Sequence, residues 1–481
     1  MGRLKQMLEN EIRLPVIYFL TNNFCTMKRL LLSLTVVAVA VTSCQKEVVY
    51  NDTPEQNQSV ELVNSCTRSY DEALAIAEDA LKLLEGEETR STTRRVIKRN
   101  EGQTVVRPVT RGSETSDEPI MYVFNNEDNQ GFTIVAADRA KEPIIAVTEH
   151  GNYTYGEPTG VEPFDLLIEQ TITNYLSIPE GPSIGNDLIP TAGKVDTVYY
   201  FKNRCEPIIL TNWSQGGIYG KYCSNGLVGC TNVAIGQIIA HHCYPSSMKF
   251  TYLNQDYKTH MYWADLTCHT QGIGVLIDGN YSCACGCNYE LLAKFLRELG
   301  YRTGTKYYDD IVTTPTIDER RSGASIANAT NVLIELGYIY STHAQNVNIG
   351  SYTDEIIANL DNGKPVVISG FNPSNIDNGS GHTWIIDGYD FFVYKIDYYG
   401  PNPNYHPVLA PNEPKLAFSF SREHYTRLWH FNWGWSGSCN GWFNYNCFKP
   451  GDAVEYDSYF SSYVHNFNVD VDLIYNIQRQ Q

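Results

Sequence analysis

A glycine-rich loop that leads into a cysteine at the start of a helix is the feature that most limits how this chain folds. In the stretch from Asn212 to His242, Cys230 directly follows Gly226-Leu227-Val228-Gly229. Apolar residues then recur within two turns, which predicts a helix with a mostly buried face. Unpaired backbone N–H groups and the positive end of the helix dipole would both favour the thiolate of Cys230. The pattern predicts a nucleophile, and a structural cysteine is the alternative.

Three polar side chains in other stretches are candidates for the same site. Gln215 lies upstream of Cys230, and its amide is able to donate a hydrogen bond to an oxyanion beside the thiol. His382 follows Gly381 at the predicted start of a strand, on the edge of a loop rich in Asn, Gly and Ser. Asn432 begins an Asn-Trp-Gly-Trp run. A single histidine or a tryptophan stripe is more often part of the packing. The prediction of an active site therefore depends on the four residues Gln215, Cys230, His382 and Asn432 together.

Three motifs occur in a fixed order along the chain. They are Gly229-Cys230 with Gln237-Ile238, then Gly381-His382 with Asp387-Gly388, then Asn432-Trp433-Gly434-Trp435. Together these motifs resemble the streptopain family of secreted bacterial cysteine peptidases, which are papain-like. The resemblance covers the chain from about Tyr122 onward, and three ordered motifs are more specific than any one of them.

The resemblance implies an endopeptidase that acts on polypeptide substrates and requires no metal or organic cofactor. Cys230 is then the nucleophile, His382 carries the proton, Gln215 helps to stabilise the oxyanion and Asn432 orients the imidazole. The residues expected to line the substrate cleft or to keep water from the histidine are Ser322, Gly381, Trp433 and Trp435. For Ser322, a helix N-cap is an equally good interpretation.

The net charge of −18 argues against nucleic acid or anionic lipid as a partner, because both are bound mainly through Lys and Arg. Thirteen cysteines favour an exported protein. Cys283, Cys285 and Cys287 alternate with other residues, a spacing that differs from zinc ribbons, so disulfides with unassigned partners are favoured over metal.

The N-terminal region predicts export. Residues 1–26 resemble an over-long gene start, and 27–43 have the charged and apolar regions of a lipoprotein signal peptide that ends before Cys44. Cys44 is the predicted lipidation site, and 44–66 form a tether. We therefore expect a lipoprotein of the outer membrane or cell surface, held to the membrane only by this lipid. Release as a secreted mature enzyme is a further expectation. An ordinary secretory signal is the alternative.

The next region, 67–176, resembles the inhibitory prodomain of streptopain. A helix from Ser69 to Glu85 begins with a Ser69–Glu72 capping box, and strands are predicted for 120–125, 131–136 and 143–148. A helix is predicted for 163–176. Between the helix that ends at Glu85 and the strand predicted for 120–125, an Arg-rich segment from Glu87 to Pro119 is expected to be a mobile loop whose charges face solvent.

A linker rich in Pro and Gly, 177–197, is the predicted cleavage zone, and 198–481 form the predicted catalytic domain. The expected fold class is α+β, with a papain-like division between a helical half and a twisted antiparallel sheet. About thirty extra residues, from Phe391 to Thr426, separate the histidine strand from the Asn-Trp-Gly-Trp run. We expect them to form a long loop that reshapes one side of the cleft.

Two other classes of function remain open from the sequence. A Cys-His pair also transfers acyl groups to amines, as in transglutaminase-like enzymes. A catalytically degenerate peptidase would serve as a surface binding lipoprotein, and Thr231-Asn232, in place of the small residues usual after the cysteine, keeps this alternative open. Retention of Gln215, Cys230, His382 and Asn432 together favours the enzyme.

Overall fold

The structure is a computed structural model, and it describes residues 67–85, 95–106, 119–138, 141–159, 165, 195–267, 275–277, 280–282, 288–308, 321–371, 381–401, 416–445 and 469–479. The signal peptide, Cys44, the helix predicted for 163–176 except Asp165, and the Cys283–Cys287 cluster lie outside these residues. No helix within the described ranges is both long and apolar enough to cross a bilayer.

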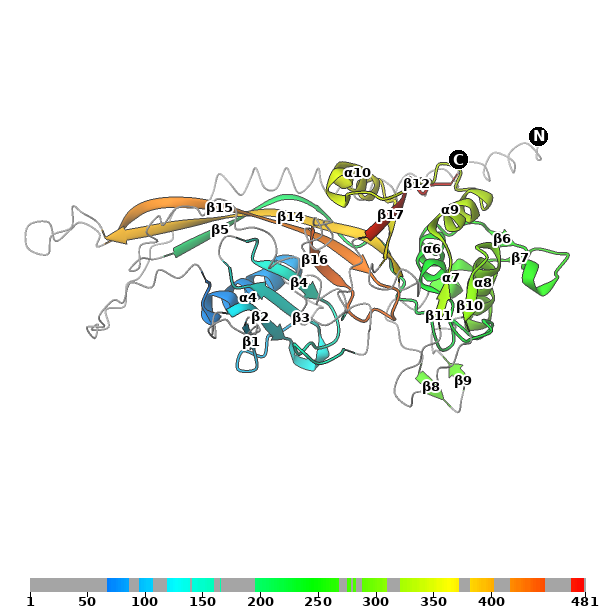
Figure 1. The fold of residues 1–481 in the computed structure, drawn as a ribbon, viewed down its shortest axis with the longest axis horizontal. Helices are drawn as coiled ribbons and strands as arrows, with labels where there is room; N and C mark the ends of the chain where they lie inside the picture. Colours follow the sequence, from blue (N-terminus) through cyan, green and yellow to red (C-terminus); the bar gives the residue numbers. More distant parts are fainter. Residues whose placement is uncertain are drawn as a thin grey trace, which may run out of the picture. The chain divides into compact units, whose positions relative to one another are not determined.

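The N-terminal part consists of one helix against four antiparallel strands, which form one end of a larger sheet. Helix α4 (Tyr70–Glu85) begins with the predicted capping box: Ser69 N–H donates to Glu72 Oε2 at 2.8 Å, and Glu72 N–H donates to Ser69 Oγ at 3.3 Å. The helix packs on the sheet, as Figure 1 shows. The four strands are β1 (Gln103–Val106), β2 (Pro119–Asn125), β3 (Phe132–Ala136) and β4 (Ile144–Thr148), with the 3₁₀ turn η1 (Glu127–Asn129) after β2. The predicted helix and hairpin are confirmed.

Two expectations for the Arg-rich segment were wrong. Strand β1 lies inside the predicted mobile loop and pairs with β2. Arg95 does not face solvent: its side chain is 14% exposed, it pairs with Glu85 at 2.6 Å, and it donates to the carbonyl oxygen of Thr148 at 2.6 Å. Arg95 therefore fastens the end of α4 to the end of β4.

The helices of the C-terminal part gather around α6 (Cys230–His241), which begins at the cysteine as predicted. Helices α8 (Tyr289–Arg302) and α9 (Ile326–Glu335) pack beside it, and α7 (Trp263–Thr267) contacts both α6 and α8 (Figure 1). Helix α10 (Thr353–Asp361) lies against the sheet instead. Short 3₁₀ turns are η2 (Thr251–Leu253) and η3 (Ile349–Tyr352).

A single antiparallel sheet joins the two parts of the chain. Its order is β1-β2-β3-β4-β16-β15-β14-β13-β17-β12, and β5 pairs with β14 off this path. The strands from the C-terminal part are β5 (Val195–Cys205), β12 (Thr342–Ala344), β13 (Val366–Phe371), β14 (Gly381–Pro401), β15 (Leu416–Asn432), β16 (Gly441–Asn444) and β17 (Val469–Tyr475). Two-stranded sheets outside it are β6 (Ser247–Met248) with β7 (Thr259–His260), β8 (Val275–Ile277) with β9 (Asn280–Ser282), and β10 (Lys306–Tyr308) with β11 (Arg321–Gly323).

The expected long loop from Phe391 to Thr426 is instead, over its described residues 391–401 and 416–426, an extension of two strands. Strands β14 and β15 remain paired from Ile385 opposite Asn432 to Pro401 opposite Leu416. Along the other edge of β14, β13 pairs with its first residues. Strand β5 pairs with residues from Tyr389 to Tyr398 on this edge (Figure 1). Because β5 begins at Val195, the last three residues of the predicted linker belong to a strand. The rest of the predicted linker, 177–194, lies outside the described residues.

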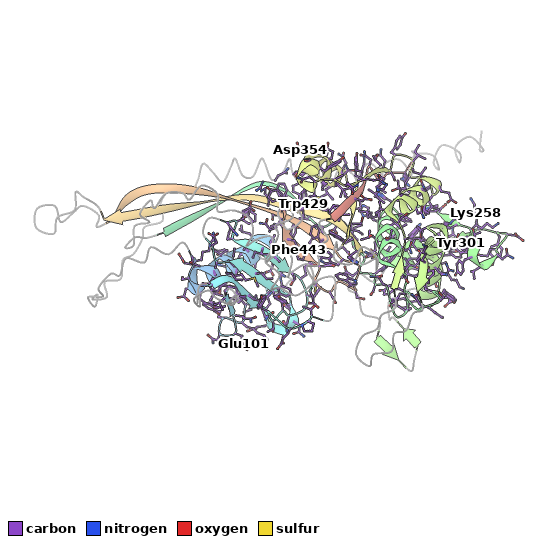
Figure 2. All side chains as sticks on the ribbon, in the orientation of Figure 1. Glu101, Lys258, Tyr301, Asp354, Trp429 and Phe443 are labelled. Carbon is purple, nitrogen blue, oxygen red and sulfur yellow. The ribbon has the colours of Figure 1, made fainter. Side chains whose placement is uncertain are left out.

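Three apolar clusters hold these layers together. The first combines N-terminal strand residues such as Val123 and Ile134 with sheet residues such as Trp429 and Phe443, both labelled in Figure 2. A second cluster joins α4 to Phe392, Leu428 and Trp442. The remaining cluster surrounds α6, and its buried residues begin at Ile209. The α+β arrangement of a helical half and an antiparallel sheet is confirmed.

Candidate active site

Cys230 is the first residue of α6, and the preceding glycine makes its position possible. Gly229 has φ 91° and ψ 135°, a conformation that L side chains rarely adopt. A Cβ added there would lie 3.1 Å from the carbonyl oxygen of Ser322. The N–H groups of Asn232 and Val233 both donate to the carbonyl of Gly229, which starts the helix directly at the cysteine.

The pKa of the Cys230 thiol is raised in this structure. Burial raises it above the ordinary value of 9.0, while hydrogen bonds with Thr383 and Thr231 lower it without reversing the shift. Burial thus opposes the thiolate that the helix terminus favours, and a thiolate in the active enzyme stays a prediction.

The two threonines connect the nucleophile to the histidine strand. The hydroxyl groups of Thr231 and Thr383 are 3.0 Å apart, and Thr231 also donates to the carbonyl of Ala324 at 3.1 Å. Each threonine is the chain neighbour of a predicted catalytic residue, Cys230 or His382. The hydrogen bond therefore fastens the start of α6 to the start of β14.

His382 is buried in a pocket of tryptophan rings. It is the second residue of β14, after Gly381, and is 3% exposed. Its ring stacks on Trp435 with centroids 4.4 Å apart and lies nearly parallel to Trp384 at 6.0 Å and to Trp433 at 6.1 Å. Burial lowers the pKa of His382 to about 4, against the opposite effect of its hydrogen bond with Trp433. The imidazole is therefore neutral near pH 7.

The carbonyl of Trp433 orients this imidazole. Nε2–H of His382 donates to it at 3.0 Å, which leaves Nδ1 as the nitrogen with a lone pair. The described contacts of Cys230 and His382 include no hydrogen bond between thiol and imidazole. In this form burial shifts the pKa values of both groups toward the neutral thiol and the neutral imidazole.

Asn432 does not make the predicted contact with His382. Its Nδ2–H donates to the carbonyl of Thr211 at 2.9 Å, and its Oδ1 accepts from Gln237 Nε2 at 3.1 Å and from Gly434 N–H at 3.2 Å. The reason is that Asn432 ends β15 with its side chain beside α6, where another buried amide is available. Its action on the histidine can only pass through the backbone of the tryptophan run.

Gln215 and Ser322 lie on segments that flank the loop before Cys230. The carbonyl of Gln215 accepts from Val228 N–H at 2.8 Å, which holds this loop against the Gln215 segment. Ser322, in β11, donates to the carbonyl of Leu227 at 2.9 Å, and its Oγ accepts from Asn225 Nδ2 at 2.9 Å. The N-cap interpretation of Ser322 was wrong, because Ser325 caps α9.

The polar pair after the cysteine, Thr231-Asn232, is fully accommodated. Asn232 is buried, donates to the Val228 carbonyl at 2.9 Å and to the Thr305 hydroxyl at 2.7 Å, and accepts from the Thr303 hydroxyl at 2.9 Å. The pair therefore replaces small residues without leaving unsatisfied polar atoms.

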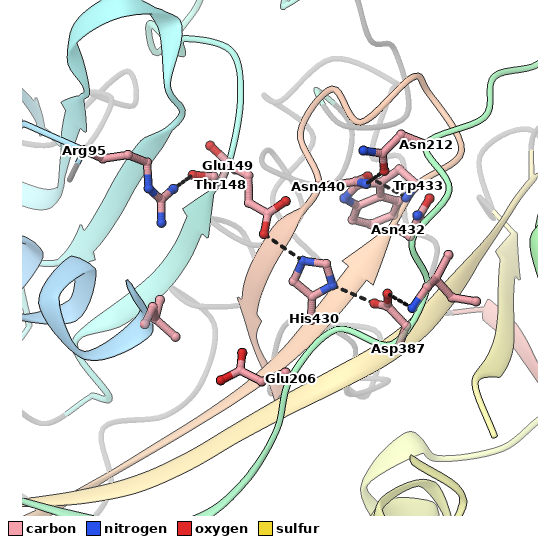
Figure 3. A network of polar contacts seen from close by, with 12 residues as sticks. Arg95, Thr148, Glu149, Glu206, Asn212, Asp387, His430, Asn432, Trp433 and Asn440 are labelled. Carbon is pink, nitrogen blue, oxygen red and sulfur yellow. Dashed lines mark hydrogen bonds and ion pairs between the residues drawn. The ribbon is translucent and has the colours of Figure 1, made fainter. Parts of the chain in front are cut away.

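A second titratable cluster lies beside the site, and the sequence reasoning missed it. His430 is 3% exposed; its Nδ1–H donates to Asp387 at 2.6 Å and its Nε2–H to Glu149 at 3.3 Å (Figure 3). Burial lowers the pKa of His430, but Asp387 and Glu149 outweigh it and raise the pKa to about 10. Glu149 directly follows β4, so a carboxylate of the N-terminal part pairs with the buried imidazolium of His430 in β15.

Asn440 joins the same N-terminal segment to the tryptophan run. Its carbonyl accepts from Glu149 N–H at 2.8 Å. Its side chain accepts from Trp433 N–H at 3.0 Å and donates to Asn212 at 3.1 Å (Figure 3). Since the Trp433 carbonyl holds His382, a short series of hydrogen bonds runs from Glu149 to the imidazole.

Further contacts attach the N-terminal part to the sheet. Strand β4 pairs with β16, with Val147 opposite Trp442. Arg427 donates to Glu142 at 2.7 Å. Arg204 donates to the carbonyls of Leu83 and Leu84 at the end of α4 and to Asp390 at 3.0 Å. None of these pairings has a local sequence signal, because the partners are far apart in the chain.

The part of the chain that the structure describes holds no group of three or more His, Cys, Asp or Glu side chains suited to a metal ion. The five described cysteines, Cys205, Cys223, Cys230, Cys243 and Cys439, are free thiols. The predicted disulfides stay a prediction for the remaining cysteines.

Comparison with known proteins defines the family. Residues 213–443 match the model of the Peptidase C10 family, and residues 62–170 match the model of the Spi protease inhibitor. The region 213–443 therefore belongs to the Peptidase C10 family, which is the streptopain family, and an inhibitor-type prodomain precedes it.

Individual relatives are distant. The thiol protease/hemagglutinin PrtT of Porphyromonas gingivalis is 23% identical over 353 residues, which cover 70% of this chain and 35% of that protein. The chain thus spans about a third of the length of this curated relative. Among solved structures, a prointerpain A fragment of Prevotella intermedia has a TM-score of 0.45 at 17% identity and covers 76% of this chain and 98% of its own. Active interpain A from the same organism has a TM-score of 0.35 at 17% identity, with 58% and 96% covered.

Proposed function

We propose that this protein is a cysteine endopeptidase made as a zymogen. The observation that carries the proposal is the 3.0 Å hydrogen bond between Thr231 and Thr383, because it holds the chain neighbours of Cys230 and His382 against each other. Family membership supports the same chemistry. Polypeptides are the proposed substrates, and the prodomain is the proposed inhibitor of its own enzyme.

The reaction follows from the roles of four groups. The Cys230 thiolate attacks the scissile carbonyl, and the His382 imidazolium gives its proton to the leaving amine, which leaves a thioester. Water then attacks the thioester while His382 takes a proton, and the acid product leaves Cys230. Gln215 and the backbone N–H of Cys230 are the proposed oxyanion donors. The rings of Trp433 and Trp435 exclude water from the imidazole.

A thiol-directed epoxide inhibitor tests this chemistry. We expect it to label the mature enzyme once, to abolish hydrolysis of an unfolded protein substrate, and to map to the peptide that contains Cys230. Cys243 is exposed and supplies an internal control for indiscriminate alkylation. Labelling of Cys243 with full loss of activity, and none of Cys230, would contradict the assignment.

Latency is proposed to end when the linker at 177–194 is cut. Strand β5 begins at Val195 and pairs with β14, so a cut before it keeps β5 in the enzyme's sheet and removes only the covalent link to the prodomain. Before the cut, the linker keeps the prodomain at a high effective concentration. In the Cys230→Ala chain, self-processing should stop, whereas added active enzyme should trim it in this window. A fully active uncut chain would overturn the proposal.

Export and lipidation at Cys44 are proposed from the signal-like residues 27–43 alone. We expect mass spectrometry of the protein from the producing cell to find a lipid on Cys44 and nothing from residues 1–43. An N-terminus elsewhere, with Cys44 unmodified, would instead indicate an ordinary secretory signal.

A further inference from the structure

Gln237 and Asn432 form a buried pair of side-chain amides next to the site. Gln237 lies in the middle of α6 and is 0% exposed, and Asn432 ends β15 and is 2% exposed. Gln237 Nε2–H donates to Asn432 Oδ1 at 3.1 Å. The bond therefore joins the nucleophile helix directly to the strand that leads into the tryptophan run.

Each end of this amide pair holds a different part of the active site. At the helix end, Gln237 Oε1 accepts from Trp213 N–H at 3.0 Å, two residues before Gln215. At the strand end, Asn432 Oδ1 also accepts from Gly434 N–H at 3.2 Å. Gly434 lies between Trp433, whose carbonyl binds His382, and Trp435, on which the imidazole stacks.

All four polar atoms of the two amides have partners, because Asn432 Nδ2–H also donates to the carbonyl of Thr211 at 2.9 Å. Around them lie buried apolar side chains, including Trp213, Val233 and Trp433. Because water does not replace a lost donor in such surroundings, removal of one amide leaves the acceptor of the other unpaired and destabilises both segments.

We propose that Gln237 and Asn432 are positioning residues, which set the oxyanion donor Gln215 and the histidine-binding Trp433 carbonyl in register with Cys230. This inference rests on the proposed peptidase function. It gives Asn432 a role that acts through the backbone of Trp433 and Gly434, without contact with the imidazole. It also gives Gln237 a part in the reaction, although it touches no reacting atom.

The test uses the mature enzyme, freed of its prodomain, with a short fluorogenic peptide. We expect Gln237→Met to lower kcat roughly ten- to a hundredfold while KM stays within about threefold, because a misplaced donor and histidine affect the transition state more than substrate binding. Activity is referred to folded protein, with Tm measured in parallel. A parent-like kcat would overturn the inference.

The conservative variant Gln237→Glu supplies a readout that lost packing would not produce. Its carboxylate still accepts from Trp213 N–H but cannot donate to Asn432, whereas the protonated acid can do both. We expect its kcat, relative to the parent at the same pH, to rise as the pH falls through the pKa of the new carboxyl group. A ratio that is independent of pH would contradict a hydrogen-bonding role.

Asn359→Asp is the matched control. Asn359 is a buried amide in α10 that donates to the Glu355 carbonyl and accepts from Asn476 N–H, and its described partners lie outside the site. We expect this variant to lower Tm with kcat nearly unchanged. A kcat loss equal to that of Gln237→Met at similar Tm would show that any buried amide has this effect, and the inference would fail.

A double-variant cycle connects Gln237 to its proposed target. If Gln237 acts through the Gln215 segment, the kcat loss in Gln237→Met/Gln215→Ala is smaller than the product of the two single losses. Independent, multiplicative losses would contradict that route. Cys230→Ala distinguishes failure of the peptidase assignment from failure of the positioning role. An active Cys230→Ala enzyme would refute the peptidase assignment. An inactive Cys230→Ala enzyme together with a parent-like Gln237→Met enzyme would refute only the positioning role.

Discussion

The half of the molecule that carries Cys230 and the half that carries His382 differ in how they meet the prodomain. The apolar cluster around α6 draws its buried residues from Ile209 onward, whereas the other two clusters mix prodomain residues with sheet residues. The polar contacts follow the same division, since Glu142 and Glu149 bind Arg427 and His430 of β15. Among the described residues, the prodomain thus holds the histidine side of the enzyme.

This difference suggests how the prodomain keeps the enzyme latent. The hydrogen bonds from Glu149 through Asn440 to Trp433 end at the carbonyl that binds His382. In this state burial lowers the pKa of His382 to about 4, and burial raises the pKa of Cys230. A neutral imidazole does not stabilise a thiolate, so we expect a change at the Trp433 carbonyl to alter the reactivity of Cys230.

The largest expected effect comes from removing either catalytic residue. Cys230→Ala and His382→Ala should each reduce kcat by at least about 10⁴-fold, and the double variant should lose little more, because the two residues act as a unit. Hydrolysis of a fluorogenic peptide by mature enzyme measures this. A much greater loss in the double variant would mean that the two halves contribute independently.

An intermediate effect is expected on the helical side. Gln215→Ala should lower kcat roughly ten- to a thousandfold if Gln215 donates to the oxyanion. The affinity of the mature enzyme for added prodomain should stay unchanged, because the described prodomain contacts lie on the other half. Prodomain affinity is measured by inhibition of peptide hydrolysis. A parallel loss of kcat and prodomain affinity would break the distinction between the halves.

A smaller effect is expected from the prodomain carboxylate. Glu149→Gln should weaken inhibition by added prodomain roughly tenfold, since it removes the charge facing His430 but its side chain is 37% exposed and partly screened. The matched control is Glu78→Gln, because Glu78 pairs with Arg99 inside the prodomain. Equal weakening by both variants would indicate a loss of prodomain stability rather than a lost contact.

The pH dependence of prodomain binding is the smallest expected effect. His430 lowers the pKa of Glu149 from 4.5 to about 2 against its burial, so its contribution is complete above 4.5 and disappears toward pH 2. The pKa of His430 is raised from 6.5 to about 10, first by Asp387 of the peptidase region and then by Glu149, so only the part due to Glu149 belongs to prodomain binding, and it disappears as the pH rises toward 10. Inhibition titrations should find binding that weakens below about pH 4.5 and again toward pH 10. Tighter binding at pH 9 than at pH 6 would contradict this pairing.

The sequence predicted features that depend on neighbouring residues. The capping box of Ser69 and Glu72 and the helix that begins at Cys230 follow from local patterns, and both are present. The family motifs also named Gln237, Asp387 and Asn432, which all lie buried near the site. Their partners were beyond prediction, because a buried amide or carboxylate takes the nearest donor in space.

Long-range pairing explains the remaining errors. Strand β14 extends into the expected loop because β5, at the start of the C-terminal part and far away in sequence, pairs with it from Tyr389 to Tyr398. The pairing of β4 with β16 was also not predicted, because the sequence of neither strand shows which other strand it pairs with. Asn432 was assigned to the histidine because the competing donor, Gln237, comes from another element.

The pH dependence of Cys230 alkylation, measured on the uncut chain and on mature enzyme, tests most directly whether the prodomain silences the catalytic pair. With iodoacetamide and mapping of the labelled peptide, we expect slow alkylation of the uncut chain that rises only above about pH 9, and rapid alkylation of mature enzyme below pH 7. Mature His382→Ala should return to the profile of the uncut chain. Rapid labelling of Cys230 in the uncut chain at pH 7 would contradict control of the pair by the prodomain.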